Sequence, residues 1–302
     1  MSARAAVSDG VAPTLELRQL AVRSAGAAWA TPLSVRSDAR RIGLVGDWEP
    51  LFQLLTGRAE ASGGSAHILG CALESAISCG VLGFAACDAL LPVSFTVVEY
   101  LRHAARLSHG STRRAVHDAQ RALDRYGLAE LAKKKLAELA LYQQRALAIA
   151  LSTLTAPAVV CLEAPVHGLD AASADYIARL CSEAAAHSRV LLSAALPSSP
   201  SAERSLLDAC DEVLVRRHDG VLTSGAPNAV FAVGASYSLS VKGPQFAAFC
   251  RALSAAGVRF EPRTPAGSLS VEIPEGGSTD LLLDAALEHG LIVLELEPLI
   301  AR

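Results

Sequence analysis

A carboxylate stands directly after one of the most apolar runs of the chain. The run is Ala158–Leu162 (AVVCL), and the acid is Glu163. At the end of a buried strand, such an acid either approaches a divalent metal ion, which prefers oxygen ligands, or is hydrogen-bonded without a chemical role. The next residue, Ala164, carries only a methyl group and has no base function. His167 lies in the following turn, where a single histidine is more often solvated than catalytic.

A second place of chemical interest is the segment after Ile42–Val45. This continuous apolar run ends at Gly46, which predicts a buried parallel strand. The next four residues are Asp47, Trp48, Glu49 and Pro50, that is two acids, an indole and a residue without a backbone N–H.

The cysteines offer no further site. There are seven, an odd number, and no pair has the C-x-x-C spacing. We therefore expect small buried hydrophobic side chains in a reducing compartment rather than disulfides or a zinc site.

Strands that alternate with helices must position these residues. Besides the two apolar runs, the sequence predicts five further strands: Thr14–Val22, Pro32–Arg36, Ser65–Leu69, Val190–Ala194 and Glu212–Arg216. Helical patterns occupy Leu51–Gly57, Thr112–Tyr126, Gln143–Leu154 and Ala171–His187. Thr96 and Glu99 have the spacing of a capping box at the start of another helix. This order predicts an α/β domain with a largely parallel sheet. The last 65 residues or so instead predict the order β-α-β-β-α-β of ferredoxin-like folds.

Composition excludes several classes of protein. The chain has 302 residues, 51% of them hydrophobic, and a formal net charge of −3. High hydrophobicity with low net charge excludes a disordered chain, and the lack of a basic excess argues against binding to nucleic acid. We expect no membrane-spanning segment, and the N-terminus lacks the apolar core of a signal peptide, so we expect a cytoplasmic protein.

The motifs in their order resemble those of an ABC-type ATPase subunit, over roughly Thr14 to Pro227. The segments that carry this resemblance are IGLVG with LFQLLTG, SGGSAHILG, DALLP with TVVEYLRHAARL, QQRALAIAL, VVCLEAPVHGLD and LTSGAP. The resemblance implies a P-loop-NTPase-like domain over 14–227, with a helical subdomain over about 96–153. The segment 236–302 is similar to the C-terminal domain of some ABC-2-type exporter ATPases, so a ferredoxin-like domain is expected there.

The phosphate loop departs from the pattern of this family. The family uses G-x-x-G-x-G-K-[ST], whose amides, lysine and hydroxyl bind phosphates and Mg²⁺. Here the loop is about four residues shorter and contains no lysine and no hydroxyl. Asp47 and Glu49 place negative charge where phosphates would sit, and one carboxylate about 4 Å from a phosphate charge costs about 4 kcal/mol at an effective dielectric constant near 20. We expect no ATP binding of the usual kind.

Other family positions are also altered. Alanines occupy the places of the catalytic acid (Ala164), the glutamine (Ala85–Ala86) and the switch histidine (Ala194–Ala195), and Ser24 stands near the place of the adenine-stacking aromatic. The resemblance therefore implies no catalytic residue, and no cofactor is expected unless ATP and Mg²⁺ bind through divergent residues. The positions of nucleotide binding would be Gly43, Gly46, Asp47, Trp48, Glu49, Pro50, Glu163, Ala164 and Asp170. The remnant of the signature motif would be Gln143, Gln144 and Arg145.

A basic stretch lies in the expected helical subdomain. Between Leu101 and Lys135 there are nine Lys or Arg residues against three acids. They form either a solvated helical face or a docking surface. In the family this subdomain docks a membrane permease, and the candidate docking residues are Arg102, Arg106, Arg113 and Arg114.

Three functions remain open from the sequence. The first is a catalytically degenerate subunit that is a structural or regulatory half of an ABC-type exporter, peripheral on the inner face of the cell membrane. Its partners would be an integral membrane permease and either a second copy or another ABC ATPase subunit. The second is an active ATPase with divergent motifs. The third is a binding or sensor module that has left transport.

Overall fold

The chain divides into two compact units, Met1–Pro227 and Asn228–Arg302. The computed structural model describes residues 12–23, 29, 31–89, 91–195, 201–216, 220, 222–231, 236–264, 267–274 and 278–298. Ser24 and residues 232–235, the end of the 227–235 segment where the sequence predicts a domain boundary, lie outside these described residues.

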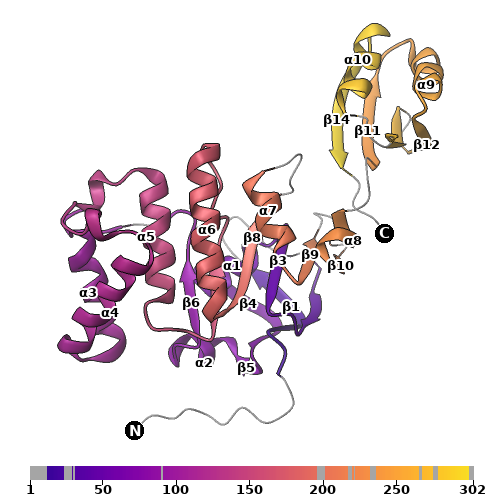
Figure 1. The fold of residues 1–302 in the computed structure, drawn as a ribbon. Coiled ribbons are helices and arrows are strands. Elements are labelled where there is room, and N and C mark those ends of the chain that lie inside the picture. The colour runs from indigo at the N-terminus through magenta and orange to yellow at the C-terminus, as the bar shows by residue number, and fades with distance from the viewer. Residues whose placement is uncertain are drawn as a thin grey trace. The chain divides into compact units, whose positions relative to one another are not determined.

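A six-stranded sheet forms the centre of the first unit (Figure 1). Its strand order is β10-β9-β3-β8-β7-β6; the last five strands are parallel, and β10 is antiparallel to β9. The strands are β3 (Arg41–Gly46), β6 (Leu82–Ala85), β7 (Val159–Leu162), β8 (Arg189–Ala194), β9 (Glu212–Arg216) and β10 (Leu222–Gly225). The predicted parallel arrangement is confirmed, because the apolar runs of β3 and β7 are buried along their length.

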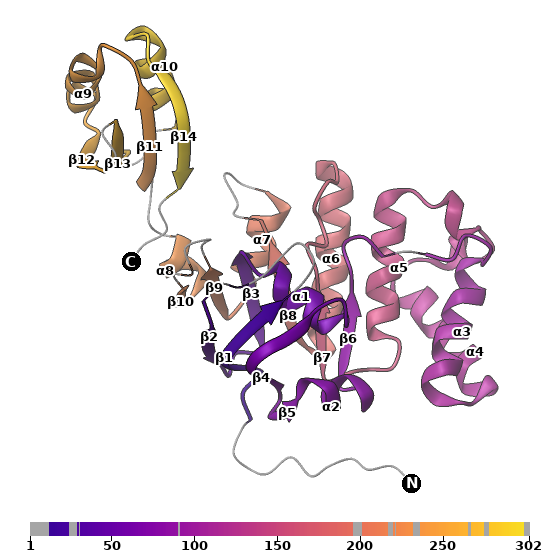
Figure 2. The same ribbon diagram turned by 180° about the vertical axis from the view of Figure 1, so that it is seen from behind.

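A second, antiparallel sheet lies on one side of the first. Its order is β2-β1-β4-β5, made of β1 (Leu15–Arg23), β2 (Leu33–Ser37), β4 (Glu60–Ile68) and β5 (Cys71–Ala72). A single apolar core joins this sheet, helix α1 (Glu49–Leu55) and the central sheet, and it contains Leu17, Ile42, Phe52 and Cys161. Figure 2 shows this sheet from behind.

Helices cover the other face of the central sheet. They are α5 (Leu141–Thr153), α6 (Ala171–His187) and α7 (Ala202–Asp208) (Figure 1). The sequence predicts α6 with its observed bounds. It misses the short elements β6, β10, α7 and α2 (Leu73–Ser78), because none of them carries a continuous apolar run like that of β7.

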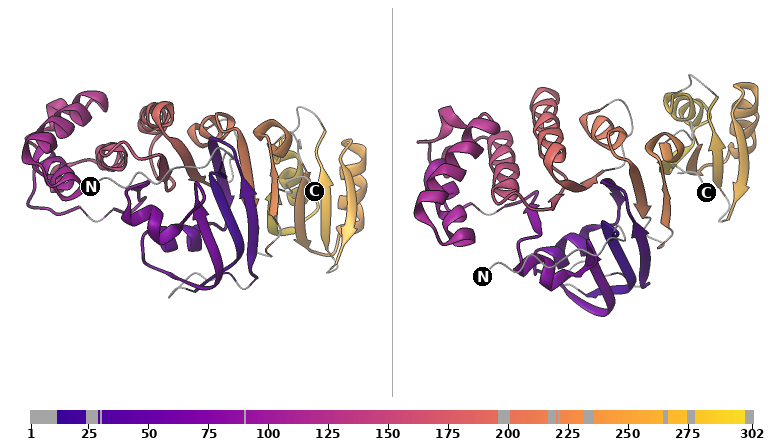
Figure 3. Two further views of the ribbon diagram at one scale, coloured as in Figure 1. Left: turned by 90° about the horizontal axis from the view of Figure 1, so that it is seen from below. Right: turned by 60° about the horizontal axis from the view of Figure 1, so that its bottom comes forward.

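The helix after Thr96 begins where the sequence predicts it. Thr96 accepts a hydrogen bond from the Glu99 N–H, and the Glu99 carboxylate accepts the Thr96 N–H at 2.8 Å, so the capping box is confirmed. Helices α3 (Val97–His109) and α4 (Thr112–Arg125) pack against each other and are followed by the 3₁₀ turns Ala129–Leu131 and Leu136–Glu138. Figure 3 shows this segment in magenta at one end of the unit.

The second unit has the predicted order of elements. A four-stranded antiparallel sheet, ordered β12-β13-β11-β14, packs on two helices. The elements are β11 (Ser236–Lys242), α9 (Phe246–Ala255), β12 (Arg259–Arg263), β13 (Ser268–Glu272), α10 (Asp280–Glu288) and β14 (Ile292–Pro298); the short helix α8 (Pro227–Phe231) spans the boundary between the units. In the part of the chain that the structure describes, no helix is long and apolar enough to cross a membrane.

Candidate functional site

The turn between β3 and α1 uses its backbone N–H groups for hydrogen bonds within the protein, and we call it the closed turn. Gly46 has φ +91°, and a Cβ at this position would lie 2.1 Å from the Arg216 carbonyl oxygen, so glycine is required for both reasons. The Asp47 N–H donates to the Arg216 carbonyl (2.9 Å), and the Trp48 N–H donates to the Gly46 carbonyl (2.9 Å). These two backbone N–H groups are therefore already hydrogen-bonded within the protein and do not face an anion.

Trp48 fills the interior behind this turn. Only 1% of it is exposed. Its indole N–H is shared between the Val45 carbonyl (3.1 Å) and the Leu214 carbonyl (3.2 Å), and the Trp29 ring meets it edge-on at 5.9 Å. The indole thus joins β3, β9 and the segment after β1 into one core.

Asp47 does not present a free charge to the turn. Its carboxylate forms an ion pair with Arg216, a side chain that is 3% exposed. The Arg216 guanidinium also lies over the Trp29 ring at 4.7 Å, and the Trp29 indole N–H donates to the Asp47 carbonyl (3.2 Å). The repulsion expected from the Asp47 carboxylate is therefore largely compensated, and burial of Trp48 is the stronger obstacle to an anion.

The remaining predicted positions of this segment have structural roles. Gly43 lies inside β3, where an added Cβ would meet the Leu207 side chain at 2.8 Å. Pro50 is in the first turn of α1, and the Glu49 carboxylate accepts a hydrogen bond from the Gln53 side chain (2.7 Å).

Glu163 lies at the carboxyl end of β7, half-buried. It accepts the Cys87 N–H (3.3 Å) and lies 3.8 Å from the Arg58 guanidinium, which also lies 3.5 Å from Asp88. Burial raises the pKa of Glu163, and the Cys87 N–H and Arg58 oppose this shift less strongly. Among the described residues, no group of three His, Cys, Asp or Glu side chains is arranged to hold a metal ion.

The raised pKa of Glu163 predicts a pH-dependent stability. An acid whose pKa is higher in the folded state destabilises the fold once it ionises. The free energy of unfolding therefore begins to fall as the pH rises above the unfolded-state pKa near 4.5, and the loss is complete above the folded-state pKa. We expect Glu163→Gln to gain stability over the wild type as the pH rises through this window, and to lose that gain in acid. Urea unfolding from pH 3.5 to 8 measures this difference. The control Glu138→Gln, at an exposed acid, should show no such trend, and a gain of E163Q that is constant with pH would contradict the prediction.

Ala164 and Asp170 shape the segment after β7. Ala164 has φ +39°, and its N–H donates to the Ser193 hydroxyl (2.9 Å). His167 is exposed, as a solvated histidine would be. Asp170 is the N-cap of α6, where it accepts the Ser173 N–H (3.0 Å) and hydroxyl (2.7 Å), and these bonds lower its pKa.

The predicted signature residues lie near the start of α5. The Gln143 side chain accepts the Ala140 N–H (3.0 Å), and the Gln144 side chain donates to the Leu139 carbonyl (2.9 Å). Arg145 is buried and donates to the Ala86 carbonyl (3.4 Å) and the Cys87 sulfur (2.9 Å). Their side chains thus serve the helix start and its contact with the segment after β6.

The four candidate docking arginines are exposed on one helical pair. Arg102 and Arg106 lie on α3, and Arg113 and Arg114 lie on α4. Arg114 is paired with the buried Asp118 at 3.6 Å.

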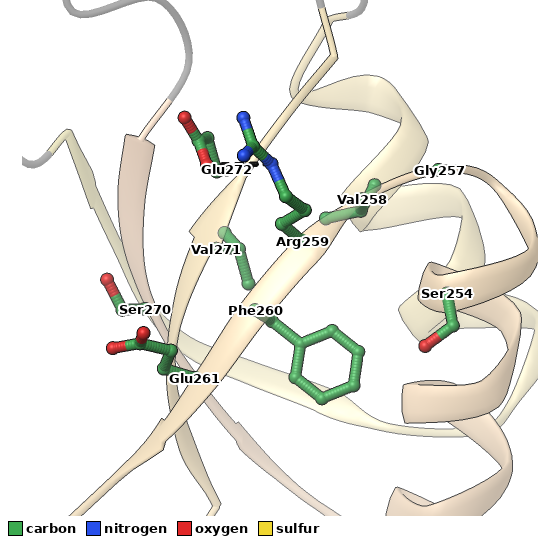
Figure 4. Close-up of a pocket in the computed structure, with 9 residues that line it drawn as sticks. All are labelled: Ser254, Gly257, Val258, Arg259, Phe260, Glu261, Ser270, Val271 and Glu272. Atoms are coloured by element: carbon green, nitrogen blue, oxygen red, sulfur yellow. Dashed lines mark ion pairs between the residues drawn. The ribbon is translucent and has the colours of Figure 1, made fainter.

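The second unit has its own hollow along β12, with a volume of about 820 Å³ (Figure 4). The Phe260 ring lies across it toward Ser254, and Arg259 pairs with Glu272 at 3.0 Å. This ion pair is exposed and contributes little. No residue that the sequence singles out as a site position lies here.

The first unit has the fold of ATP-binding subunits of ABC transporters. It is similar to a structure described as the ATP binding subunit of an ABC transporter (17% identity, 72% of this chain and 91% of that chain, TM-score 0.59). It is also similar to CbiO1 of Clostridium perfringens, part of the ABC transporter complex CbiONQ, with 20% identity over 73% of this chain and 91% of that chain and a TM-score of 0.61. A third similar structure is a nucleotide-free ATP-binding cassette from an ABC transporter, with 16% identity over 71% of this chain and 91% of that chain and a TM-score of 0.59. No protein-family model matches the chain, and no curated protein matches its sequence.

Proposed function

We propose that the chain is a catalytically degenerate ABC subunit, which acts as the structural or regulatory half of an export assembly. The observation that carries this proposal is the closed turn between β3 and α1. Phosphates need backbone N–H donors and usually a lysine, but here the amides of Asp47 and Trp48 are bonded internally and there is no lysine.

Hydrolysis would also lack a base. Ala164 has no acidic group, and Glu163 is the single carboxylate at the end of β7. Loss of a general base costs about 10² to 10⁴ in rate. The resemblance implies head-to-tail dimers, in which each ATP site lies between the phosphate loop of one chain and the signature motif of the other. A homodimer of this chain would contain no intact site, and in a heterodimer each of the two sites would lack one half.

Titration with ATP and Mg²⁺ tests the proposal. We expect no change in the thermal unfolding midpoint, whereas a ligand present at 1,000 times its Kd stabilises by about 4 kcal/mol. Ala164→Glu, which restores an acid but leaves the turn closed, should also give no ATP turnover. Micromolar ATP affinity would overturn the proposal. Turnover that Glu163→Gln abolishes would instead favour the active ATPase.

We also propose the assembly around this subunit. The basic face of α3 and α4 docks a membrane permease, which holds the chain on the inner face of the cell membrane. Residues 14–227 form the ATPase-like domain and residues 236–302 a ferredoxin-like domain; the order β-α-β-β-α-β and the sheet order β12-β13-β11-β14 support the latter.

Charge reversal on α3 tests the docking. We expect Arg102→Glu with Arg106→Glu to reduce several-fold the fraction of the chain that sediments with membranes of its own cell, because both side chains are exposed and free to face a partner. The matched control is Arg251→Glu with Arg263→Glu in the second unit. Equal sedimentation of the wild type and the α3 variant would contradict this docking surface, and no sedimentation at all would favour a module outside transport.

A further inference from the structure

Arg145 carries a buried charge without an acidic partner. Only 8% of the residue is exposed, and its Nε atom has no hydrogen-bond partner. Its two terminal nitrogens donate to a carbonyl, that of Ala86, and to the Cys87 sulfur. Among the described residues, no carboxylate forms an ion pair with it within 4.0 Å. Burying an unpaired charge costs free energy. A bound anionic ligand would supply the partner that this guanidinium lacks.

The nearby acids are already engaged by another cation. Glu163 and Asp88 both lie within 4.0 Å of Arg58, at 3.8 and 3.5 Å, and Glu163 also accepts the Cys87 N–H. Arg58 therefore compensates these two acids and leaves Arg145 uncompensated.

Arg145 lines a cavity of about 340 Å³ between α5 and the segment after β6. The polar lining comes from Cys87, Asp88, Gln144 and Arg145. One N–H of the Gln144 side-chain amide donates to the Leu139 carbonyl, and the second N–H of the same group is a further donor for a ligand. The rest of the lining is apolar: Ala86, Ala89, Leu141 and Ala148.

We propose that this cavity binds a small monocarboxylate, held by Arg145. A guanidinium matches the geometry of a carboxylate, and the alanine and leucine side chains suit a short apolar remainder. Among the described residues that line the cavity, Arg145 is the one cation, so it matches a ligand with one negative charge better than a doubly charged phosphate.

Two alkylating reagents of nearly equal size test the site on the full-length chain. Iodoacetate is anionic and iodoacetamide is neutral; in both cases the thiolate sulfur attacks the CH₂ carbon and iodide leaves. Cys87 is half-buried in the cavity wall, and the exposed Cys79 is the reference on the same chain. Because one charge-assisted hydrogen bond favours the anion about tenfold or more, we expect the iodoacetate-to-iodoacetamide rate ratio at Cys87 to exceed that at Cys79 by about tenfold. Peptide mass spectrometry measures both sites. Equal ratios at the two cysteines would overturn the proposal.

Variants and competitors separate the carboxylate site from other effects. Arg145→Gln should bring the Cys87 ratio down to that of Cys79, while Arg102→Gln, which removes an exposed charge on α3, should leave it unchanged. In the wild type, propionate should slow the reaction of Cys87 with iodoacetamide and leave Cys79 unaffected, whereas phosphate at equal ionic strength should protect neither. If Arg145→Gln fails to fold, the propionate experiment still decides. Protection by phosphate alone, or by neither anion, would refute a monocarboxylate site.

Discussion

Replacing Trp48 by alanine is expected to lower the free energy of unfolding by about 3 to 5 kcal/mol. The side chain is 1% exposed, shares its N–H between two carbonyls and contacts the Trp29 ring. Its removal leaves a cavity where β3, β9 and α1 meet, and such a cavity cannot collapse without moving the central sheet. Urea unfolding, followed by far-ultraviolet circular dichroism, measures the loss.

Trp48→Phe is the matched control for this experiment. It keeps an aromatic ring but removes the N–H, so it is expected to cost about 1 to 3 kcal/mol and therefore less than the alanine variant. Ile77→Ala, at an exposed position on α2, should cost almost nothing. If Trp48→Ala loses less than Ile77→Ala, the indole is not the support of this turn.

Breaking the ion pair between Asp47 and Arg216 is expected to be asymmetric. Asp47→Ala leaves a guanidinium that is 3% exposed without its acid, which costs about 3 kcal/mol or more. Arg216→Met leaves the Asp47 carboxylate, which is 22% exposed and can reach water, so it should cost less. Denaturant unfolding of both variants compares the two losses.

The double variant completes the test. Asp47→Ala with Arg216→Met should recover part of the stability that Asp47→Ala loses, because no buried charge remains unpaired. A double variant whose loss equals the sum of the two single losses would show that the two side chains are not coupled.

The fold could be predicted from the sequence where an element carries a long pattern. The apolar runs of β3 and β7, the periodicity of α6 and the Thr96 cap are local signals, and all four are confirmed. The strand β6 is as short as β7, but Gly83 interrupts it and most of it is only half-buried, so no continuous apolar run marks it. The helix α7 is mostly polar, so its placement depends on tertiary packing.

The closed turn could be predicted only in part. The sequence shows that lysine is missing and that Asp47 and Glu49 bring negative charge, but it does not show that Arg216 compensates Asp47. That partner lies 169 residues away and is aligned by the parallel register of β3 and β9, in which Gly46 faces Arg216. The one signal in the sequence is that Trp48, one of the two tryptophans of the chain, stands inside the turn.

Other site residues are brought together by packing rather than by spacing. Glu163, Cys87 and Arg58 come from three separate segments and meet at the end of the central sheet. The contact between the Cys87 thiol and the Arg145 guanidinium could not be predicted either, because no sequence motif links the two residues.

The double anchoring of Trp48 limits which mutations of the turn the fold can tolerate. A mutation that placed a lysine in the turn would gain no phosphate affinity while the indole and the Asp47–Arg216 pair remained. A mutation that removed either feature first would lower stability before any benefit could appear. Mutations that would open this turn to an anion therefore pass through less stable variants of the chain.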